Sequence, residues 1–128
     1  MIDHVSVEVR DLAASAAFYD AVFAPLGLGR LAERPSAIGF GKTYPEFWLN
    51  LRRGVRRADA DTGHHLCLRA PSREAVTAFH DAALAGGGRS DGAPGVRQAA
   101  MTTYFGAFIR DLDGNKIEAA TFPQKDGG

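Results

Sequence analysis

The feature that most constrains the fold of this chain is an internal repeat. Shifting the first half by 61 positions places His4 on His65 and aligns a whole strand-plus-helix unit without a gap. Identical residues then meet at Ala14/Ala75, Ala17/Ala78, Phe18/Phe79, Asp20/Asp81, Ala21/Ala82, Ala24/Ala85 and Gly27/Gly88. The alanines add little in an alanine-rich chain, but the histidine, phenylalanine and aspartate matches argue against coincidence. We therefore predict two copies of one folding unit.

The first copy reads as a strand, a helix and three more strands. Residues 2–10 alternate apolar and polar side chains, which is typical of a strand with one buried face. A helix with Asp11 as its cap is expected over residues 12–24, and Pro25 and Gly27 end it. Short alternating segments at 29–33, 37–41 and 46–52 predict the remaining strands.

The second copy follows the same order after a polar stretch, residues 54–62, that is typical of a linker. A strand is predicted at 64–70 and a helix from the cap Ser72 to about Ala85. A turn-rich segment at 92–95, with a poor strand beside it, precedes strands at 104–110 and 116–122. Asp113-Gly114 predicts the hairpin between these last two strands. The 128 residues should thus form one domain with half-modules of about 1–54 and 62–123.

These units predict an α+β fold of paired βαβββ modules. Val5, Val7 and Val9 share the strand face that packs on the helix, so His4 lies on the opposite face. If the two curved sheets meet edge to edge, their uncovered faces form an open, incomplete barrel around a central cleft. His4 and His65 would face this cleft from equivalent positions.

Composition narrows the classes of partner. The formal net charge is zero and no basic stripe with interleaved aromatic residues occurs, which argues against nucleic acid. No apolar run approaches the length that spans a membrane. The single cysteine excludes a disulfide within the chain, and a strand begins almost at Met1, so no signal peptide is expected. We expect a cytoplasmic protein.

Strand alternation places Glu118 on the same face as the two histidines. A carboxylate among the apolar residues of a strand is costly unless it is paired, ligated or solvated. Two neutral imidazoles and one carboxylate from three strands are a suitable set of ligands for a divalent metal ion, with positions left for water and substrate. His4, His65 and Glu118 are therefore the candidate metal ligands, although each residue alone would more often be exposed or hydrogen-bonded.

Other side chains are expected beside this site. Trp48 would form a flat apolar wall suited to a planar ligand, and Asn50 and Phe108 share its cleft. Tyr104 is a candidate for catalysis together with Glu118, or else fills space at the rim of the core. Arg97 follows the turn at 92–95, where it would bind an anionic ligand or face solvent.

Three stretches of the chain resemble the vicinal oxygen chelate superfamily, the group of glyoxalases, bleomycin resistance proteins and extradiol dioxygenases. They are DHVSVEVRDLAASAAFYDAVFAPLG, HLCLRAPSREAVTAFHDAALAGGG and AFIRDLDGNKIEA. The resemblance implies the paired βαβββ fold, with ligands from the first and last strands of each half, here His4, Trp48, His65 and Glu118. Trp48 cannot be a ligand, which counts against a glyoxalase I activity. The two-His, one-Glu set instead resembles that of extradiol dioxygenases, which use Fe(II) or Mn(II).

The resemblance leaves three functions open. The first is a glyoxalase-like metal-dependent enzyme of lyase, isomerase or dioxygenase type, using Zn, Ni, Fe or Mn to chelate a small substrate through adjacent oxygens. The second is a metal-free protein of the bleomycin-resistance type that sequesters a small molecule. The third is a scaffold for dimerisation or regulation. A homodimer is expected, and some members of the family build each site across two chains.

Overall fold

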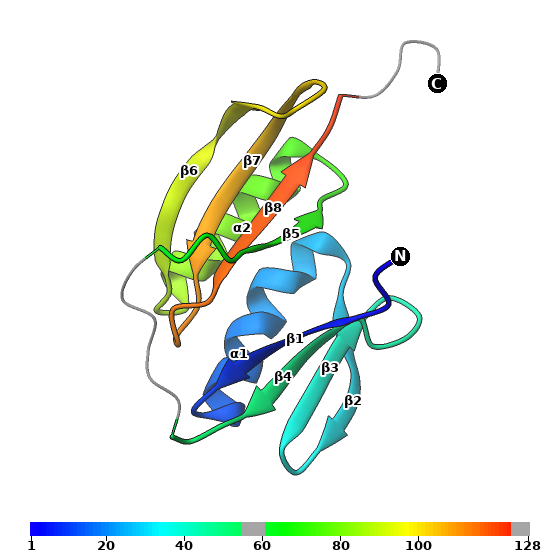
Figure 1. Cartoon of the computed structure of the whole chain (residues 1–128), viewed down its shortest axis with the longest axis vertical. Helices are drawn as coiled ribbons and strands as arrows, with labels where there is room; N and C mark the ends of the chain where they lie inside the picture. The colour runs from blue at the N-terminus through cyan, green and yellow to red at the C-terminus, as the bar shows by residue number, and fades with distance from the viewer. Residues whose placement is uncertain (55–60, 124–128) are drawn as a thin grey trace.

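A computed structural model describes residues 1–54 and 61–123 of the chain. The stretch expected to be a linker lies largely outside these residues. The elements follow in the order β1 (Val5–Val9), α1 (Leu12–Phe23), the 3-10 helix η1 (Ala24–Leu26), β2 (Gly29–Arg34), β3 (Ala37–Gly41), β4 (Phe47–Leu51), β5 (Leu66–Arg69), α2 (Arg73–Ala85), β6 (Arg89–Gln98), β7 (Thr103–Arg110) and β8 (Lys116–Thr121). Figure 1 shows that each helix is followed by three strands.

The strands form two four-stranded sheets with the same topology, in the orders β1-β4-β3-β2 and β5-β8-β7-β6. In each sheet the first strand pairs in parallel with the last, while the other pairs are antiparallel. The two sheets do not close into a barrel. The predicted α+β fold of paired βαβββ units, open rather than closed, is thereby confirmed.

Local sequence explains where the helices begin. The side chain of Asp11 accepts a hydrogen bond from Ala14 N and that of Ser72 accepts one from Ala75 N, so each satisfies an otherwise unpaired amide of a first turn. The first helix then tightens into η1, which ends at Gly27 with a φ of 78°, a left-handed conformation that suits glycine.

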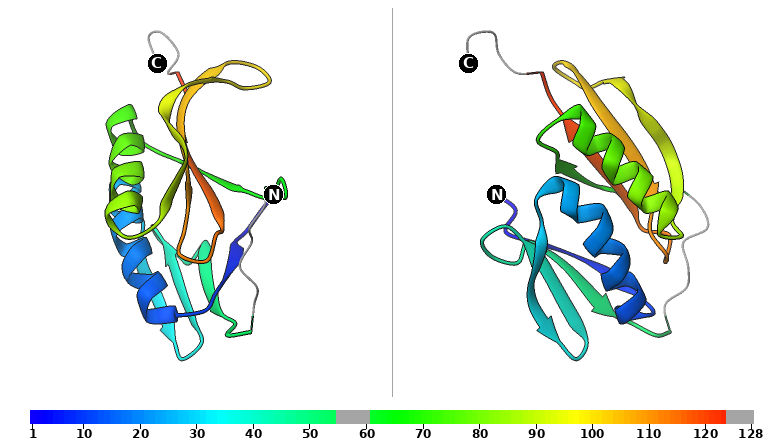
Figure 2. Two further views of the ribbon diagram at one scale, coloured as in Figure 1. Left: turned by 90° about the vertical axis from the view of Figure 1, so that its left-hand side faces the viewer. Right: turned by 180° about the vertical axis from the view of Figure 1, so that it is seen from behind.

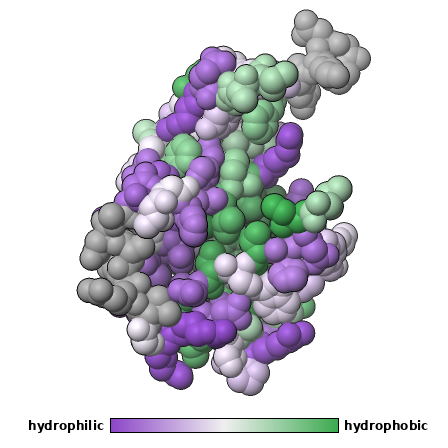
Figure 3. Space-filling model, viewed as in Figure 1, coloured by the Kyte–Doolittle hydropathy of each residue, from purple (hydrophilic) through white to green (hydrophobic). Residues whose placement is uncertain are grey.

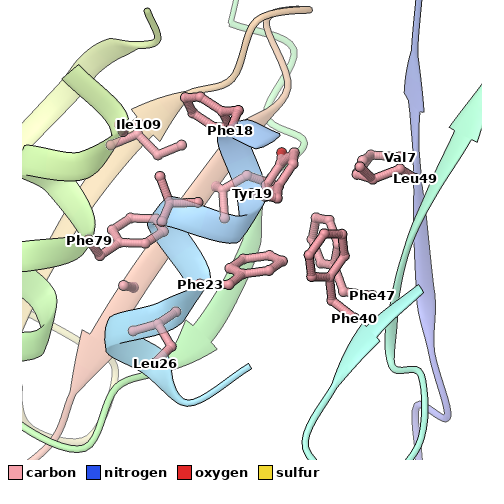
Figure 4. Packing of buried hydrophobic residues seen from close by; sticks show 14 of the residues in the cluster. Val7, Phe18, Tyr19, Phe23, Leu26, Phe40, Phe47, Leu49, Phe79 and Ile109 are labelled. Atoms are coloured by element: carbon pink, nitrogen blue, oxygen red, sulfur yellow. The ribbon is translucent and has the colours of Figure 1, made fainter. Parts of the chain in front are cut away.

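The two helices form a layer behind both sheets, as the side view in Figure 2 shows. Helix α1 lies between the first sheet and α2, and aromatic side chains fill the space around it (Figure 4). Tyr19 and Phe23 of α1 contact Phe47 of β4 with ring-centroid distances of 5.2 and 4.9 Å. Because the core is continuous across the helices, one face of each sheet is buried. We call the face that turns away from the helices the outer face.

The turn between β7 and β8 joins the two halves through polar contacts. Asp111 is 2% exposed, and its carboxylate accepts hydrogen bonds from the Tyr19 hydroxyl at 2.6 Å and from the backbone N–H of Asn115 at 2.8 Å. Asp113 accepts from the backbone and the guanidinium of Arg10, at 3.1 Å each. This turn therefore fixes how the second half sits against α1 and β1.

Several element boundaries differ from the sequence predictions. His4 and His65 lie just before their strands instead of inside them. The segment expected to hold a poor strand is the ten-residue β6, which carries irregular register at residues 90–95. His80 of α2 is 6% exposed and its Nε2 lies 2.7 Å from the Ser90 hydroxyl, because α2 packs this side chain against β6.

Candidate functional site

The outer face of the second sheet gathers most of the predicted site residues. Strand register places Phe108 opposite Glu118 and Cys67 beside it, while Arg97 lies opposite Tyr104. The apolar residues on either side of Glu118 in β8, Ile117 and Ala119, point to the opposite face and are buried toward the helices. The outer face seen in Figure 3 carries hydrophobic side chains along its middle, with polar side chains on both sides.

Glu118 lies at the centre of this group. Its side chain is 5% exposed, and its Oε2 accepts a hydrogen bond of 2.5 Å from the Tyr104 hydroxyl. Its Oε1 lies 3.5 Å from Nε2 of His65. The Cys67 thiol is adjacent, and burial together with the Glu118 carboxylate raises the pKa of this thiol to about 12. Cys67 is therefore a protonated neighbour of the carboxylate at neutral pH and not a nucleophile.

Tyr104 is held in place by stacking. Its ring lies on Phe122 with a centroid distance of 5.3 Å and an angle of 23° between the planes. Desolvation of the phenol and its hydrogen bond to Glu118 raise the pKa of Tyr104 to about 12. The hydroxyl therefore keeps its proton at neutral pH and acts as a donor toward Glu118.

The absence of a side chain at Gly106 makes this arrangement possible. A Cβ at this position of β7 would lie 2.7 Å from Cε2 of Tyr104 and 3.2 Å from Oε2 of Glu118. Carbon atoms in real side chains are not found this close together. Glycine thus lets the phenol lie flat across the sheet and reach the carboxylate.

Phe108 is surrounded by cationic groups and by His65. The His65 ring meets the ring of Phe108 edge-on with a centroid distance of 5.6 Å. The ammonium of Lys116 and the guanidinium of Arg97 lie 4.9 and 5.3 Å from the same ring centroid. The Arg97 guanidinium also donates hydrogen bonds to the carbonyls of Gly95 and Ala93 in the irregular strand β6 and of Gly106 in β7, so its donors are directed at the backbone.

The candidate ligand His4 lies elsewhere. It lines a cleft of about 410 Å³ on the outer face of the first sheet, together with Trp48, Asn50 and Arg34. Its Nδ1 is 2.8 Å from the Asp3 carboxylate and its side chain is 55% exposed. His65 lines a separate cleft of about 550 Å³ between β1 and the strands β5 and β8.

The three predicted metal ligands therefore do not come together in the chain as described. Residues 1–54 and 61–123 contain no group of three or more His, Cys, Asp or Glu side chains placed to hold one metal ion. What the structure brings together is the pair His65 and Glu118, with Tyr104 as a hydrogen-bond donor. The Tyr104 hydroxyl is hydrogen-bonded to Oε2 of Glu118. The other carboxylate oxygen, Oε1, and the imidazole of His65 therefore remain as two ligand groups of the types that divalent metals bind.

Two features near the site were not anticipated from sequence. Gly106 carries no chemistry of its own, and only the register of β7 against β8 reveals that it lies beneath Tyr104. The pairs Arg34–Trp48 and Arg69–Phe122 have guanidinium-to-centroid distances of 5.0 and 4.8 Å. Alternation in β5 does place Arg69 on the same face as Cys67, which was an available signal.

Comparisons with known proteins agree with this fold. The family model "Glyoxalase/Bleomycin resistance protein/Dioxygenase superfamily" matches residues 1–119. A crystal structure of a glyoxalase/bleomycin resistance protein from Albidiferax ferrireducens is similar with a TM-score of 0.83 and 35% identity, over 94% of this chain and 98% of that one. A comparison with curated proteins finds no significant match.

More distant structures share the fold alone. A lactoylglutathione lyase from Agrobacterium tumefaciens has a TM-score of 0.64 at 22% identity, over 94% of this chain and 92% of that one. A genomically encoded fosfomycin resistance protein from Listeria monocytogenes has a TM-score of 0.67 at 15% identity, over 96% and 93%. None of the helices in the part of the chain that the structure describes has the length and apolar character needed to cross a membrane. The family match over residues 1–119 shows that this chain belongs to the glyoxalase/bleomycin resistance protein/dioxygenase superfamily.

Proposed function

We propose that this protein is a metal-dependent enzyme of lyase, isomerase or dioxygenase type, acting on a small substrate that binds through two adjacent oxygens. The observation that carries the proposal is the buried carboxylate of Glu118 with His65 Nε2 at 3.5 Å and a tyrosine donor at 2.5 Å. A buried glutamate surrounded by a histidine and a protonated phenol is arranged for ligation or proton handling rather than for packing. Similarity in fold to a lactoylglutathione lyase makes the lyase class reasonable.

The third ligand is proposed to be His4 of the partner subunit in a homodimer. In the part of one chain that the structure describes, the outer face with His4 and Trp48 holds an open cleft, and on the other outer face His65 beside Glu118 is 41% exposed. Placing the first sheet of one chain over the second sheet of another would join these faces and exclude water from the ligands. We call this arrangement the shared site.

A divalent ion of zinc, nickel, iron or manganese in the shared site would supply Lewis acidity, stabilising negative charge on the substrate oxygens. The chain's own residues would orient the metal ligands and bind the substrate. Glu118 offers Oε1 while Tyr104 holds Oε2 by its proton, which fixes the orientation of the carboxylate. Trp48, Asn50 and Phe108 would line the substrate, and Tyr104, whose one hydroxyl proton is donated to Glu118, would take part in catalysis by keeping this carboxylate oriented. We also propose a cytoplasmic location.

A metal-free binding protein is the second candidate, because no three-ligand group occurs among the described residues of one chain. Trp48 separates the two functions. It is the single tryptophan and lines the cleft that holds His4. Quenching of its fluorescence by planar ligands, unchanged by a chelator, would favour binding without metal. Metal-dependent turnover of hydroxy-ketones or catechols would favour the enzyme.

Mixing two variants tests the shared site directly. His4→Ala and Glu118→Ala chains should each bind Mn²⁺ weakly as homodimers. In a mixed dimer, His4 of one chain meets the intact His65 and Glu118 of the other, so one complete site per dimer returns. The measurement is Mn²⁺ stoichiometry after refolding the chains together, with His64→Ala, which changes the neighbouring histidine, as control. No gain on mixing would contradict the shared site, and absence of metal uptake by the unaltered protein would overturn the enzyme proposal.

A further inference from the structure

Two arginines on the outer faces have no anionic partner among the residues that the structure describes. The side chains of Arg69 of β5 and Arg34 of β2 form no hydrogen bond or ion pair with any residue in the described ranges 1–54 and 61–123, and each contacts an aromatic ring instead. The other cations near Glu118 are engaged. Lys116 lies 3.1 Å from the Asp91 carboxylate, Arg110 lies 3.0 Å from the same group, and Arg97 binds backbone carbonyls.

The guanidinium of each of these two arginines contacts an aromatic ring next to its own sheet. The guanidinium carbon of Arg69 lies 4.8 Å from the ring centroid of Phe122, and that of Arg34 lies 5.0 Å from the ring centroid of Trp48. An aromatic ring interacts with the face of the guanidinium and leaves its in-plane N–H donors available. These donors match the spacing of two oxygens of a carboxylate, phosphonate or phosphate.

Both arginines stand beside proposed metal ligands. Arg34 lines the same cleft as His4 and Trp48. Arg69 shares the outer face with Cys67 and Glu118, while Phe122 beneath it stacks on Tyr104, which in turn donates to Glu118. Of the two carboxylates beside the proposed metal ligands, Asp3 pairs with His4 and Glu118 accepts a hydrogen bond from Tyr104. The positive charge of the two guanidinium groups is therefore directed at whatever occupies the clefts.

We propose that Arg34 and Arg69 select substrates that carry an oxyanion group, a carboxylate, phosphonate or phosphate, beside the oxygens that would bind metal. This inference rests on the proposed function for its metal-chelating part. The specificity itself depends on the arginines. Removing either one should weaken binding of anionic ligands while leaving neutral chelators of the same shape unaffected.

Matched hydroxamates provide the probes. Acetohydroxamate chelates a metal through two adjacent oxygens and carries no further group, whereas malonomonohydroxamate adds a carboxylate and phosphonoacetohydroxamate adds a phosphonate. We expect the Mn²⁺-loaded protein to bind at least one anionic probe about tenfold more tightly than acetohydroxamate, measured by titration calorimetry. The stronger of the two identifies the preferred oxyanion.

Variants assign the effect to the arginines. Arg69→Gln and Arg34→Gln should each reduce the preference for the anionic probe by about tenfold, without changing the affinity for acetohydroxamate. Arg73→Gln is the matched control, because Arg73 also lies on a phenylalanine, 5.0 Å from the ring centroid of Phe105, but belongs to helix α2. It should leave all three affinities unchanged. Equal binding of charged and neutral probes, or equal weakening of both in the two variants, would overturn the inference.

A metal-free measurement separates this inference from the proposed function. Methylphosphonate is titrated without metal, with the fluorescence of Trp48 as the signal because Arg34 lies on this ring. If the protein takes up no Mn²⁺ but binds methylphosphonate in a manner lost in Arg34→Gln, the metal-dependent function fails and the oxyanion site stands. If methylphosphonate does not bind either, both fail.

Discussion

The hydroxyl of Tyr104 donates a hydrogen bond of 2.5 Å to Oε2 of Glu118, across Gly106 of β7, the strand that also carries Tyr104. The bond connects two adjacent strands on the outer face of the second sheet, and stacking on Phe122 fixes the phenol. A buried carboxylate with one oxygen held in this way presents the other oxygen in a defined direction. That direction is toward Nε2 of His65.

Replacing Tyr104 with phenylalanine should therefore weaken metal binding without unfolding the protein. Tyr104→Phe retains the ring that stacks on Phe122 but removes the donor that orients Glu118. Loss of a hydrogen-bonding partner to a metal ligand typically lowers metal affinity by about 10- to 100-fold. Titration with Mn²⁺ or Zn²⁺ measures this change, and circular dichroism checks the fold.

Tyr44→Phe is the control for that substitution. The Tyr44 hydroxyl is exposed and its only hydrogen bond in the described part of the chain is a long one of 3.5 Å to the Asp3 carbonyl. Its removal should leave metal affinity unchanged. Equal metal affinity in Tyr104→Phe and the unaltered protein would show that Tyr104 has no part in orienting Glu118.

The hydrogen bond between Tyr19 and Asp111 should contribute to stability, because it joins the two halves in a buried place. Tyr19 is fully buried and its hydroxyl lies 2.6 Å from Oδ2 of Asp111. Tyr19→Phe should lower the free energy of unfolding by about 2 kcal/mol, the usual effect of losing a hydrogen bond to a charged group. Urea unfolding measures this loss. A change below about 0.5 kcal/mol, within the range of ordinary surface substitutions, would contradict the assigned role.

Stability should also fall at alkaline pH, with Tyr19 as one contributor. Burial, and then the charge and hydrogen bond of Asp111, raise the pKa of Tyr19 well above its ordinary value of 10.0. The folded protein thus keeps a proton that the unfolded chain releases above pH 10. Stability is complete below this pH and declines as pH rises above it, by up to about 1.4 kcal/mol per pH unit for one group.

The comparison with Tyr19→Phe isolates this contribution. In urea unfolding between pH 9 and 11, the variant should lose stability less steeply than the unaltered protein. Some decline should remain, because the pKa values of Cys67, Tyr104 and Tyr44 are also raised. Parallel curves for the two proteins would mean that Tyr19 does not titrate at a raised pKa.

The sequence predicts much of this fold because the repeat carries independent local signals. Caps at Asp11 and Ser72, alternating valines and the Asp113-Gly114 hairpin all agree with two βαβββ units, and the helices begin where the caps predict. Each of these signals lies within a few residues of its effect. Alternation also places Glu118 and Tyr104 on one face, which the register confirms.

Interactions between distant elements are less accessible from sequence. The burial of His80 depends on β6, whose glycine-rich sequence hides a ten-residue strand. The burial of Asp111 depends on the packing of a turn against α1, which alternation cannot reveal. His4 and His65 occupy equivalent positions in the repeat, which suggests that their side chains meet at one site. In one chain they line two separate clefts instead. The ligand set therefore stays a prediction about an assembly.

Gly106 gives the sharpest test of the local geometry. Gly106→Ala would place a Cβ 2.7 Å from the Tyr104 ring and 3.2 Å from both Oε2 of Glu118 and the Ala119 carbonyl. The Ala119 carbonyl belongs to the backbone of β8 and cannot shift easily. The Tyr104 ring must therefore move, and its hydrogen bond to Glu118 must lengthen or break. We expect metal affinity to fall at least as far as in Tyr104→Phe, about tenfold or more.

The matched control is Gly29→Ala on strand β2. A Cβ there has no atom within 4 Å, so the same change of residue in the same type of element meets open space. Metal affinity should be unchanged in Gly29→Ala, while Gly106→Ala combined with Tyr104→Phe should be little worse than either alone, since both act through one hydrogen bond. If the two substitutions multiplied their effects, Gly106 would be acting on Glu118 by another route, through the Ala119 carbonyl of β8 rather than through the phenol.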